Sequence, residues 1–298
     1  MKRLIVNADD FGMTKGVNRA VADAHRTGII TSTTLMATGT AFQDAARVAR
    51  ANPSLGVGCH VVLVEGSPLL SAAQIPNLAL ETPAGIAYRH NFGQFVRSAL
   101  LGHIPSEEIT REASAQITKL QNAGIAVTHL DTHKHAHVFP EIFRPLLRAA
   151  SACGVRAIRN PFEPTAAISL RAMLPRPELA RRLLPVRLLR VFAAEFQREV
   201  QAAGLLTTDG TLGITLTGMY DWQAFDQLLS RIPDGTWELL CHPAYEDELW
   251  RALGPRPGSG EKELVLFGSE WARGRLARLG VDLITYRDLT AEQAVAAA

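Results

Sequence analysis

Long apolar runs are absent from this chain of 298 residues. No stretch approaches the roughly 18 consecutive apolar residues that a membrane-spanning helix needs. The N-terminal segment Met1–Asn7 has a basic start but only three apolar residues, which is too few for the core of a signal peptide. These absences lead us to expect a cytoplasmic protein.

Cysteine and net charge are also scarce. The three cysteines, Cys59, Cys153 and Cys241, are an odd number, which argues against a disulfide framework and suits a reducing compartment. The formal net charge of +2 gives no sign of nucleic-acid binding. The chain has neither a G-x-x-x-x-G-K-[ST] phosphate loop nor a G-x-S-x-G nucleophile elbow. The 47% of hydrophobic residues is nevertheless ample for a large core.

Short apolar or β-branched runs alternate with amphipathic stretches. The first run, Leu4–Val6, precedes a predicted helix that Thr14 caps and Gly28 ends. This βαβα order predicts a parallel sheet with right-handed crossovers, and seven or eight such units favour a (β/α) barrel, a single domain over residues 1–298. The later strands are expected at 31–37, 55–62, 125–132, 155–159, 211–217, 237–241 and 281–285.

Two segments interrupt this rhythm. Val64–His90 is long, proline-containing and without clear periodicity, which is typical of a functional lid or a disordered loop. Phe162–Gly204 is predicted to be a helical insertion that either caps the site or touches an anionic or membrane surface. Because glutamates interrupt its charge, a solvated helical face is the favoured interpretation. Its arginines are Arg171, Arg176, Arg181, Arg182, Arg187, Arg190 and Arg198.

Chemically active residues follow four predicted strands. In a parallel barrel all carboxyl ends of strands open on one face, where active sites are assembled. Carboxylate and imidazole together hold a borderline divalent metal and leave a position for water, and a second carboxylate supplies a general base. The sequence therefore predicts metal-assisted hydrolysis. The four clusters are Asn7–Gly12, Gly58–His60, Asp131–His137 and Leu240–Ala244.

Strand periodicity refines this prediction. While the segment stays extended, Asp131, His133, His135 and His137 share one side and Lys134 points to the other. Only the first one or two of these residues can bind the same ion, because successive same-side residues diverge along the strand. By the same alternation, the cysteines that precede His60 and His242 face the helical shell as packing residues. Alone, the Asp9–Asp10 pair would suggest only a turn or a helix cap, and His60 is as well explained as a buried core residue.

Several spaced motifs resemble the YdjC-like carbohydrate deacetylase family, with chitooligosaccharide and hopanoid-associated branches. The resemblance implies a distorted (β/α) TIM-like barrel that hydrolyses the N-acetyl group of an amino sugar. It departs from the family at Lys134, where many members have histidine, and at Ala244, where many have glycine. The matching segments are Ile5–Gly12, Gly28–Thr34, Leu55–His60, Gly66–Pro68, Thr128–Pro140 and Cys241–Pro243.

Carried onto this sequence, the resemblance implies metal ligands Asp10, His60 and His133, general base Asp9, and His242 as the acid. The family's metal is usually magnesium, with zinc also plausible. Two imidazoles favour zinc or another transition ion over magnesium, so the identity of the one divalent ion is left open.

Weak branch markers bear on the substrate. The His-Lys-His pattern at 133–135 and the segment Val61–Pro68 are similar to the hopanoid-associated branch, which implies an acetylglucosaminyl lipid and peripheral membrane contact. A soluble chitooligosaccharide stays open, and a homodimer is expected from the family. The predicted substrate contacts are His135, His137, Arg156 and Arg159. For the two arginines, ordinary salt bridges are the favoured role.

Two other classes of function compete with this one. A different metal-dependent hydrolase, such as a phosphoesterase, would need several cations at the barrel mouth, and only Arg156 and Arg159 offer themselves. A non-enzymatic metal-binding protein would need no carboxylate base beside the ligands, so Asp9 separates that class from the enzymes.

Overall fold

The computed structural model describes residues 1–164, 177–253 and 256–296. Its centre is a parallel sheet in the order β6-β3-β2-β1-β8-β7, and β9 pairs with the start of β1. The strands are β1 (Lys2–Phe11), β2 (Ser32–Leu35), β3 (Gly56–Val61), β6 (Val127–Thr132), β7 (Gly210–Leu212), β8 (Gly235–Cys241) and β9 (Val281–Leu283).

The segment after β6 carries the sheet round towards β7. Ile158 bridges Leu130 of β6, and the neighbouring Ala157 bridges Leu206, both in parallel register. Farther along, the backbone N–H of Thr211 in β7 donates to the carbonyl of Phe162 at 3.2 Å. The strands therefore curl into a distorted barrel, which confirms the predicted α/β fold class.

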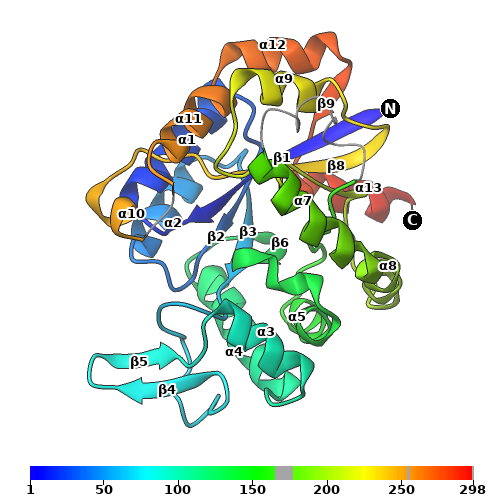
Figure 1. The fold of residues 1–298 in the computed structure, drawn as a ribbon. Coiled ribbons are helices and arrows are strands. Elements are labelled where there is room, and N and C mark those ends of the chain that lie inside the picture. The colour runs from blue at the N-terminus through cyan, green and yellow to red at the C-terminus, as the bar shows by residue number, and fades with distance from the viewer. Residues whose placement is uncertain (165–176, 254–255, 297–298) are drawn as a thin grey trace.

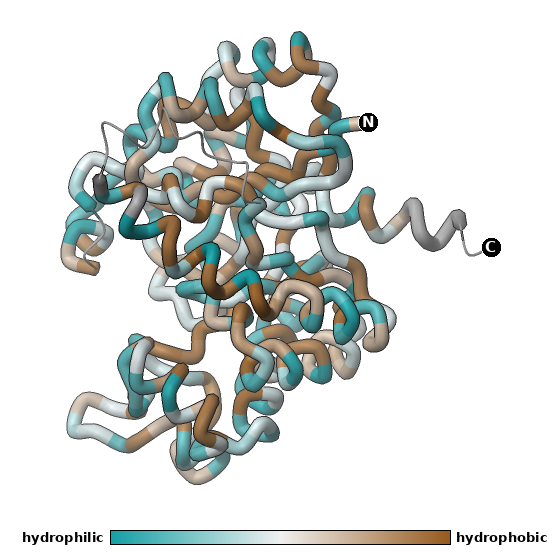
Figure 2. Tube along the Cα trace, turned by 45° about the vertical axis from the view of Figure 1, so that its right-hand side comes forward, coloured by the Kyte–Doolittle hydropathy of each residue, from teal (hydrophilic) through white to brown (hydrophobic). Residues whose placement is uncertain are grey.

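Helices surround the strands (Figure 1), and hydrophobic and hydrophilic residues alternate along them (Figure 2), as amphipathic packing requires. The predicted cap is confirmed, because the Thr14 side chain accepts from the Val17 N–H. None of the described helices has the length and apolar character needed to cross a membrane. The helices are α1 (Lys15–Thr27), α2 (Phe42–Ala51), α3 (Phe92–Leu100), α4 (Ser106–Asn122), α5 (Pro140–Ala152), α7 (Pro177–Leu189), α8 (Ala193–Ala202), α9 (Trp222–Leu229), α10 (Glu248–Ala252), α11 (Ser259–Phe267), α12 (Glu270–Arg278) and α13 (Tyr286–Ala296), with 3₁₀ turns η1 (His133–Val138) and η2 (Arg190–Phe192).

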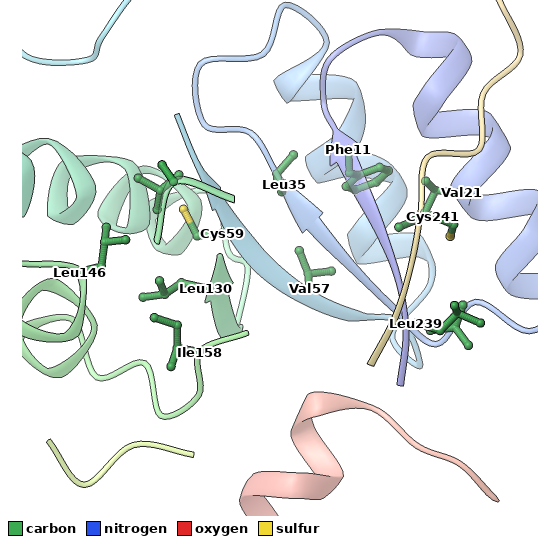
Figure 3. Packing of buried hydrophobic residues seen from close by; sticks show 14 of the residues in the cluster. Phe11, Val21, Leu35, Val57, Cys59, Leu130, Leu146, Ile158, Leu239 and Cys241 are labelled. Carbon is green, nitrogen blue, oxygen red and sulfur yellow. The ribbon is translucent and has the colours of Figure 1, made fainter. Parts of the chain in front are cut away.

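Cys59 and Cys241 belong to the apolar core. Both are fully buried in the cluster that contains Phe11, Leu35 and Leu130 (Figure 3). The prediction that these thiols pack on the shell side is confirmed, and it follows from strand alternation that the histidine after each cysteine faces the barrel interior.

The segment 64–90 is more ordered than expected. It contains the antiparallel hairpin β4 (Ala79–Thr82) and β5 (Gly85–Tyr88), which projects from the body of the molecule (Figure 1). Glu112 of α4 anchors it by accepting the backbone N–H groups of Leu69 and Leu70. The strands are too short to give a clear period in the sequence.

The insertion 162–204 is helical where it is described, as predicted, and supplies α7, η2 and α8. Two of its predicted surface arginines, Arg171 and Arg176, lie outside the described residues. In Figure 1, α7 lies across the front of the strands.

Candidate active site

Asp9 and Asp10 are neighbours on β1, where regular alternation would send their side chains to opposite faces. The backbone departs from this pattern, because Asp10 has a left-handed φ of 61° and the register with β2 shifts between Ala8 and Phe11. A bulge of this kind re-aims side chains, and it lets both carboxylates serve one site.

The three predicted metal ligands lie together at the carboxyl ends of β1, β3 and β6. Asp10 Oδ1 is 3.3 Å from His60 Nε2 and 3.2 Å from His133 Nδ1. One donor atom from each residue lies within 4.8 Å of the others. Asp10 Oδ1 is also buried without a hydrogen bond of good geometry. One carboxylate and two imidazoles around an orphaned oxygen fit a divalent ion of the zinc type.

Asp131 fixes the orientation of His60. Its Oδ1 accepts from His60 Nδ1 at 2.7 Å, and its Oδ2 accepts from the Thr34 hydroxyl at 3.1 Å. Burial alone would lower the pKa of His60, but the carboxylates of Asp131, Asp10 and Asp9 outweigh it and hold that pKa well above its usual range. The Nδ1 hydrogen bond leaves Nε2 for the ligand position, which is the usual arrangement behind a metal-binding histidine.

Asp9 is held by a buried arginine. Arg159 Nη1 and Nη2 donate to the two Asp9 oxygens at 2.7 and 2.6 Å, and Asn7 Nδ2 donates to Oδ1 at 2.9 Å. Burial would raise the pKa of Asp9, but the Arg159 guanidinium outweighs it and keeps the pKa well below its usual range. Asp9 therefore remains ionised beside the candidate metal ligands.

Arg159 forms salt bridges, the role favoured for it from the sequence, and its full burial contradicts the alternative of a substrate contact. Its side chain is fully buried among Asp9, Asp131 and Glu238, which neutralise a charge that could not be buried alone. Arg156 is exposed and stands before the segment that pairs with β6, so its backbone is farther from the strand ends.

Two groups of residues have the spacing to hold a metal, and the Arg159 cluster indicates which of them is the better site. The first group is Asp10, His60 and His133. The second group comprises Asp9, His60 and Asp131. The Arg159 guanidinium already contacts both carboxylates of that group and supplies its cation. The first group, around Asp10, is consequently the better metal site.

His242 approaches Asp9 from β8. Its Nε2 is 3.9 Å from Asp9 Oδ2, and its Nδ1 is buried without a partner. Its backbone N–H donates to the buried Glu263, which also accepts the Gly218 N–H. Burial raises the pKa of Glu263. A cavity of about 290 Å³ is lined by Asp9, His60, His133, His242, His135 and Arg182, among others.

The histidine-rich segment turns earlier than predicted. β6 ends at Thr132, and η1 follows with left-handed φ values of 59° at Lys134 and 53° at His135. The prediction that Lys134 points away is wrong, because it lines the same cavity as His133 and His135. Its ammonium group pairs with Glu65.

His135 and His137 lie in different environments. His135 lines the 290 Å³ cavity together with Asp9 and His242, as a substrate contact would. Burial lowers its pKa to about 3, so it is neutral. His137 is fully buried and its Nδ1 is hydrogen-bonded to the Thr132 hydroxyl at 2.6 Å, so its predicted substrate contact is corrected to a role in holding the turn.

Sequence reasoning missed Glu65, Glu238 and Glu263, and noted Asp131 only as part of a spacing pattern. Glu238 had a usable signal, because a carboxylate within an apolar strand must find a buried partner. Glu65 had no such signal. All four described non-glycine residues with positive φ, namely Asp10, Glu65, Lys134 and His135, gather at this site. Strained backbone of this kind clusters at functional sites.

Known proteins are similar to this chain over nearly its whole length. A family model described as YdjC-like protein matches residues 3–278. A carbohydrate deacetylase from Geobacillus stearothermophilus is 34% identical over 287 residues, which cover 95% of this chain and 96% of the relative. A chitooligosaccharide deacetylase from Klebsiella pneumoniae is 31% identical over 291 residues, which cover 96% and 98% of the two chains.

A solved structure shares the fold. An Enterococcus faecalis protein named for cellobiose-phosphate cleavage aligns with a TM-score of 0.70 and 25% identity, over 97% of this chain and 98% of that one. The extent of the family match and the identity to the curated relatives lead to one conclusion: this chain belongs to the YdjC-like protein family.

Proposed function

We propose that this protein is a metal-dependent carbohydrate deacetylase that removes the N-acetyl group from an amino sugar, with residues 1–298 acting as one domain. The observation that carries the proposal is that two groups of residues meet at one cavity. His60 and His133 of the Asp10–His60–His133 triad line that cavity together with Asp9 and His242. The names of the Geobacillus and Klebsiella relatives support the same activity.

Asp10, His60 and His133 would hold one divalent ion. When bound, the ion lowers the pKa of a water and polarises the acetyl carbonyl. The two imidazoles favour zinc or another transition ion, and magnesium stays the alternative. Asp9, Asp131 and Glu238 contact the Arg159 guanidinium, whereas Asp10 contacts the two imidazoles. Asp10 is therefore the carboxylate that is available to a bound cation.

Asp9 is the proposed base and His242 is the proposed acid in the proton transfers. Asp9, held ionised by Arg159, accepts a proton from the attacking water. Its depressed pKa makes it a weak base, so the proton passes on readily to His242, whose Nε2 is 3.9 Å away. The water oxygen bonds to the carbonyl carbon, the C–N bond breaks, His242 protonates the amine, and acetate leaves.

The substrate is either a chitooligosaccharide or an acetylglucosaminyl lipid of the hopanoid type. A second cavity of about 410 Å³ opens beside Asp10 and His133. Its Thr38, Thr40 and Ser67 offer hydroxyls for sugar recognition, and Met13 and Met36 offer apolar surface. His135 is the proposed substrate contact on the other side of the metal ligands. We also propose a homodimer and a cytoplasmic location.

Acetate release by the purified, metal-loaded protein tests this function. The panel contains chitobiose, longer chitooligosaccharides, N-acetylglucosamine and an acetylglucosaminyl lipid. Acetate from one substrate, lost in the His133→Ala variant, is expected. Asp9→Asn should bind zinc like the parent chain while losing turnover.

Two results would contradict the proposal. Release of phosphate from a phosphoester, without acetate from any acetylated sugar, would favour the rival hydrolase. Metal binding at one ion per chain, with no turnover of either class, would favour a metal-binding protein. If Asp9→Asn keeps full activity, Asp9 is not the base.

A further inference from the structure

The outer face of α7 carries an apolar stripe that nothing in the described structure covers. Leu184, Leu188 and Val191 are 63%, 66% and 75% exposed. Apart from Met1, they are the most exposed large hydrophobic side chains among the described residues. Their spacing of four and three residues places them on one side of α7 and its continuation η2. A contiguous apolar surface of this kind marks an interaction site.

The charge around the stripe has one sign. From Leu179 to Ala194 the sequence has four arginines and no carboxylate. Arg181 and Arg187 are exposed beside the stripe. The flanking acids have partners on other elements, since Glu178 pairs with Arg256 and Glu195 pairs with Arg144. The face is therefore both apolar and cationic.

The opposite side of α7 is fixed to the body of the protein. Arg182 donates to the Thr217 carbonyl and Arg190 to the Glu163 carbonyl, each at 2.6 Å. Val186 and Leu189 line an apolar cavity of about 210 Å³ together with Phe139 and Phe162. That cavity also borders Lys134 and His135, and Arg182 lines the catalytic cavity. Whatever α7 docks on is thereby brought close to the active site.

We propose that the outer face of α7 docks this protein on an anionic lipid bilayer. The three apolar side chains would enter the interface between headgroups and acyl chains, and the arginines would lie at the level of the phosphates. Nucleic acid would leave the apolar stripe without a partner. A second copy of the same face would bring like-charged arginines together. An anionic bilayer offers acyl chains to the apolar stripe and phosphates to the arginines.

Vesicle co-sedimentation of the full chain tests the proposal without any substrate. We expect binding to phosphatidylglycerol vesicles, little binding to phosphatidylcholine vesicles, and weakening as salt rises. The double variants Leu184→Ser/Leu188→Ser and Arg181→Gln/Arg187→Gln should each lower the partition coefficient by about tenfold. The matched control is Leu100→Ser/Leu101→Ser at the C-terminal end of α3, where the two side chains are 46% and 57% exposed. This variant should bind like the parent chain.

Circular dichroism of each variant establishes that it is folded. Equal binding by the parent chain and the α7 variants would overturn the proposal, as would absence of binding to anionic vesicles. A dimer in sedimentation velocity that the leucine variant dissolves would assign the face to a second copy instead. This inference does not rest on the deacetylase activity. Bilayer binding can therefore be disproved while the activity is found, and the activity can be disproved while bilayer binding is found.

Discussion

At the scale of single residues, Arg159 has the most unusual environment. It is a fully buried guanidinium bound to three carboxylates from different strands, and it contacts Asp9 through both terminal nitrogens. The arrangement keeps Asp9 ionised and fixes its position relative to the metal ligands. Buried ion clusters of this type cost much to assemble, but removing one partner costs more, because the others are left without a counter-charge.

Replacing Arg159 should therefore destabilise the protein strongly. Arg159→Met leaves Asp9, Asp131 and Glu238 buried together without a cation, and we expect the free energy of unfolding to fall by about 3–5 kcal/mol. Urea denaturation measures this change. Arg156→Met is the matched control, because Arg156 is exposed and its loss should cost under about 0.5 kcal/mol. Equal effects of the two substitutions would show that the cluster does not need its arginine.

His129 should make stability sensitive to acid. Its ring is fully buried, stacks on Tyr286 at 3.8 Å, and its Nε2 is 3.1 Å from Asn7 Oδ1. Burial, assisted by the charge of Arg159, holds its pKa well below 6.5. Below pH 6.5 the unfolded chain therefore binds a proton that the native state refuses, and stability falls as pH falls.

The predicted contribution is a loss of up to about 1.4 kcal/mol per pH unit below pH 6.5. His129→Gln keeps a hydrogen-bond donor but cannot titrate. Urea unfolding of the parent chain and this variant between pH 7 and pH 5 isolates the effect as the difference between two slopes. Parallel slopes would mean that His129 gains its proton as easily in the native state as in the unfolded one.

At the scale of elements, polar residues of α4 organise the long segment before α3. Glu108, Glu112 and Gln116 are buried and lie one helical turn apart. Glu112 accepts the Leu69 and Leu70 N–H groups and Gln116 accepts the Val62 N–H. These bonds satisfy backbone that would otherwise be unpaired, and they set the position of the 410 Å³ cavity, which Glu65 and Ser67 help to line.

Glu112→Gln should loosen this segment without unfolding the barrel. The amide NH₂ of the glutamine would face a backbone donor where a carboxylate oxygen now accepts, at a local cost of about 1–3 kcal/mol. Hydrogen exchange of the amides in 66–90 should then become at least about fivefold faster, while β1 remains protected. Glu107→Gln, on the exposed side of α4, is the control and should change neither region. Unchanged exchange in both variants would contradict the anchoring role.

The elements also show what sequence can and cannot predict here. The family resemblance selected the triad Asp10, His60 and His133. The strand ends that carry it could be placed because apolar periodicity and parallel topology bring strand ends to one face. The turn at Lys134 and His135 could not, because a left-handed backbone in non-glycine residues is imposed by tertiary contacts, including the Lys134–Glu65 pair. The partners of Arg159 could not be predicted for a related reason: the three carboxylates are 28 to 150 positions away in sequence.

At the scale of the whole molecule, a bound ion should join the strands that supply its ligands. Asp10, His60 and His133 come from the ends of three strands, so an ion held by them binds the folded state and not the unfolded chain. By mass action, free zinc at about 100 times the dissociation constant would stabilise the fold by about 2.7 kcal/mol. For a chain of this size, the corresponding rise in Tm is roughly 4 °C.

Differential scanning calorimetry of chelator-treated protein, with and without added zinc, measures this rise. His133→Ala should abolish the rise, and the control His103→Ala, which changes an exposed histidine away from the triad, should keep it. An equal rise in the His133 variant would place the ion elsewhere on the protein. Asp10→Asn should also lose the response to zinc, and it should melt below the metal-free parent chain, because the Asp10 carboxylate helps to hold the pKa of His60 above its usual range. Such a result would mean that the Asp10 carboxylate both holds the ion and stabilises the metal-free fold through His60.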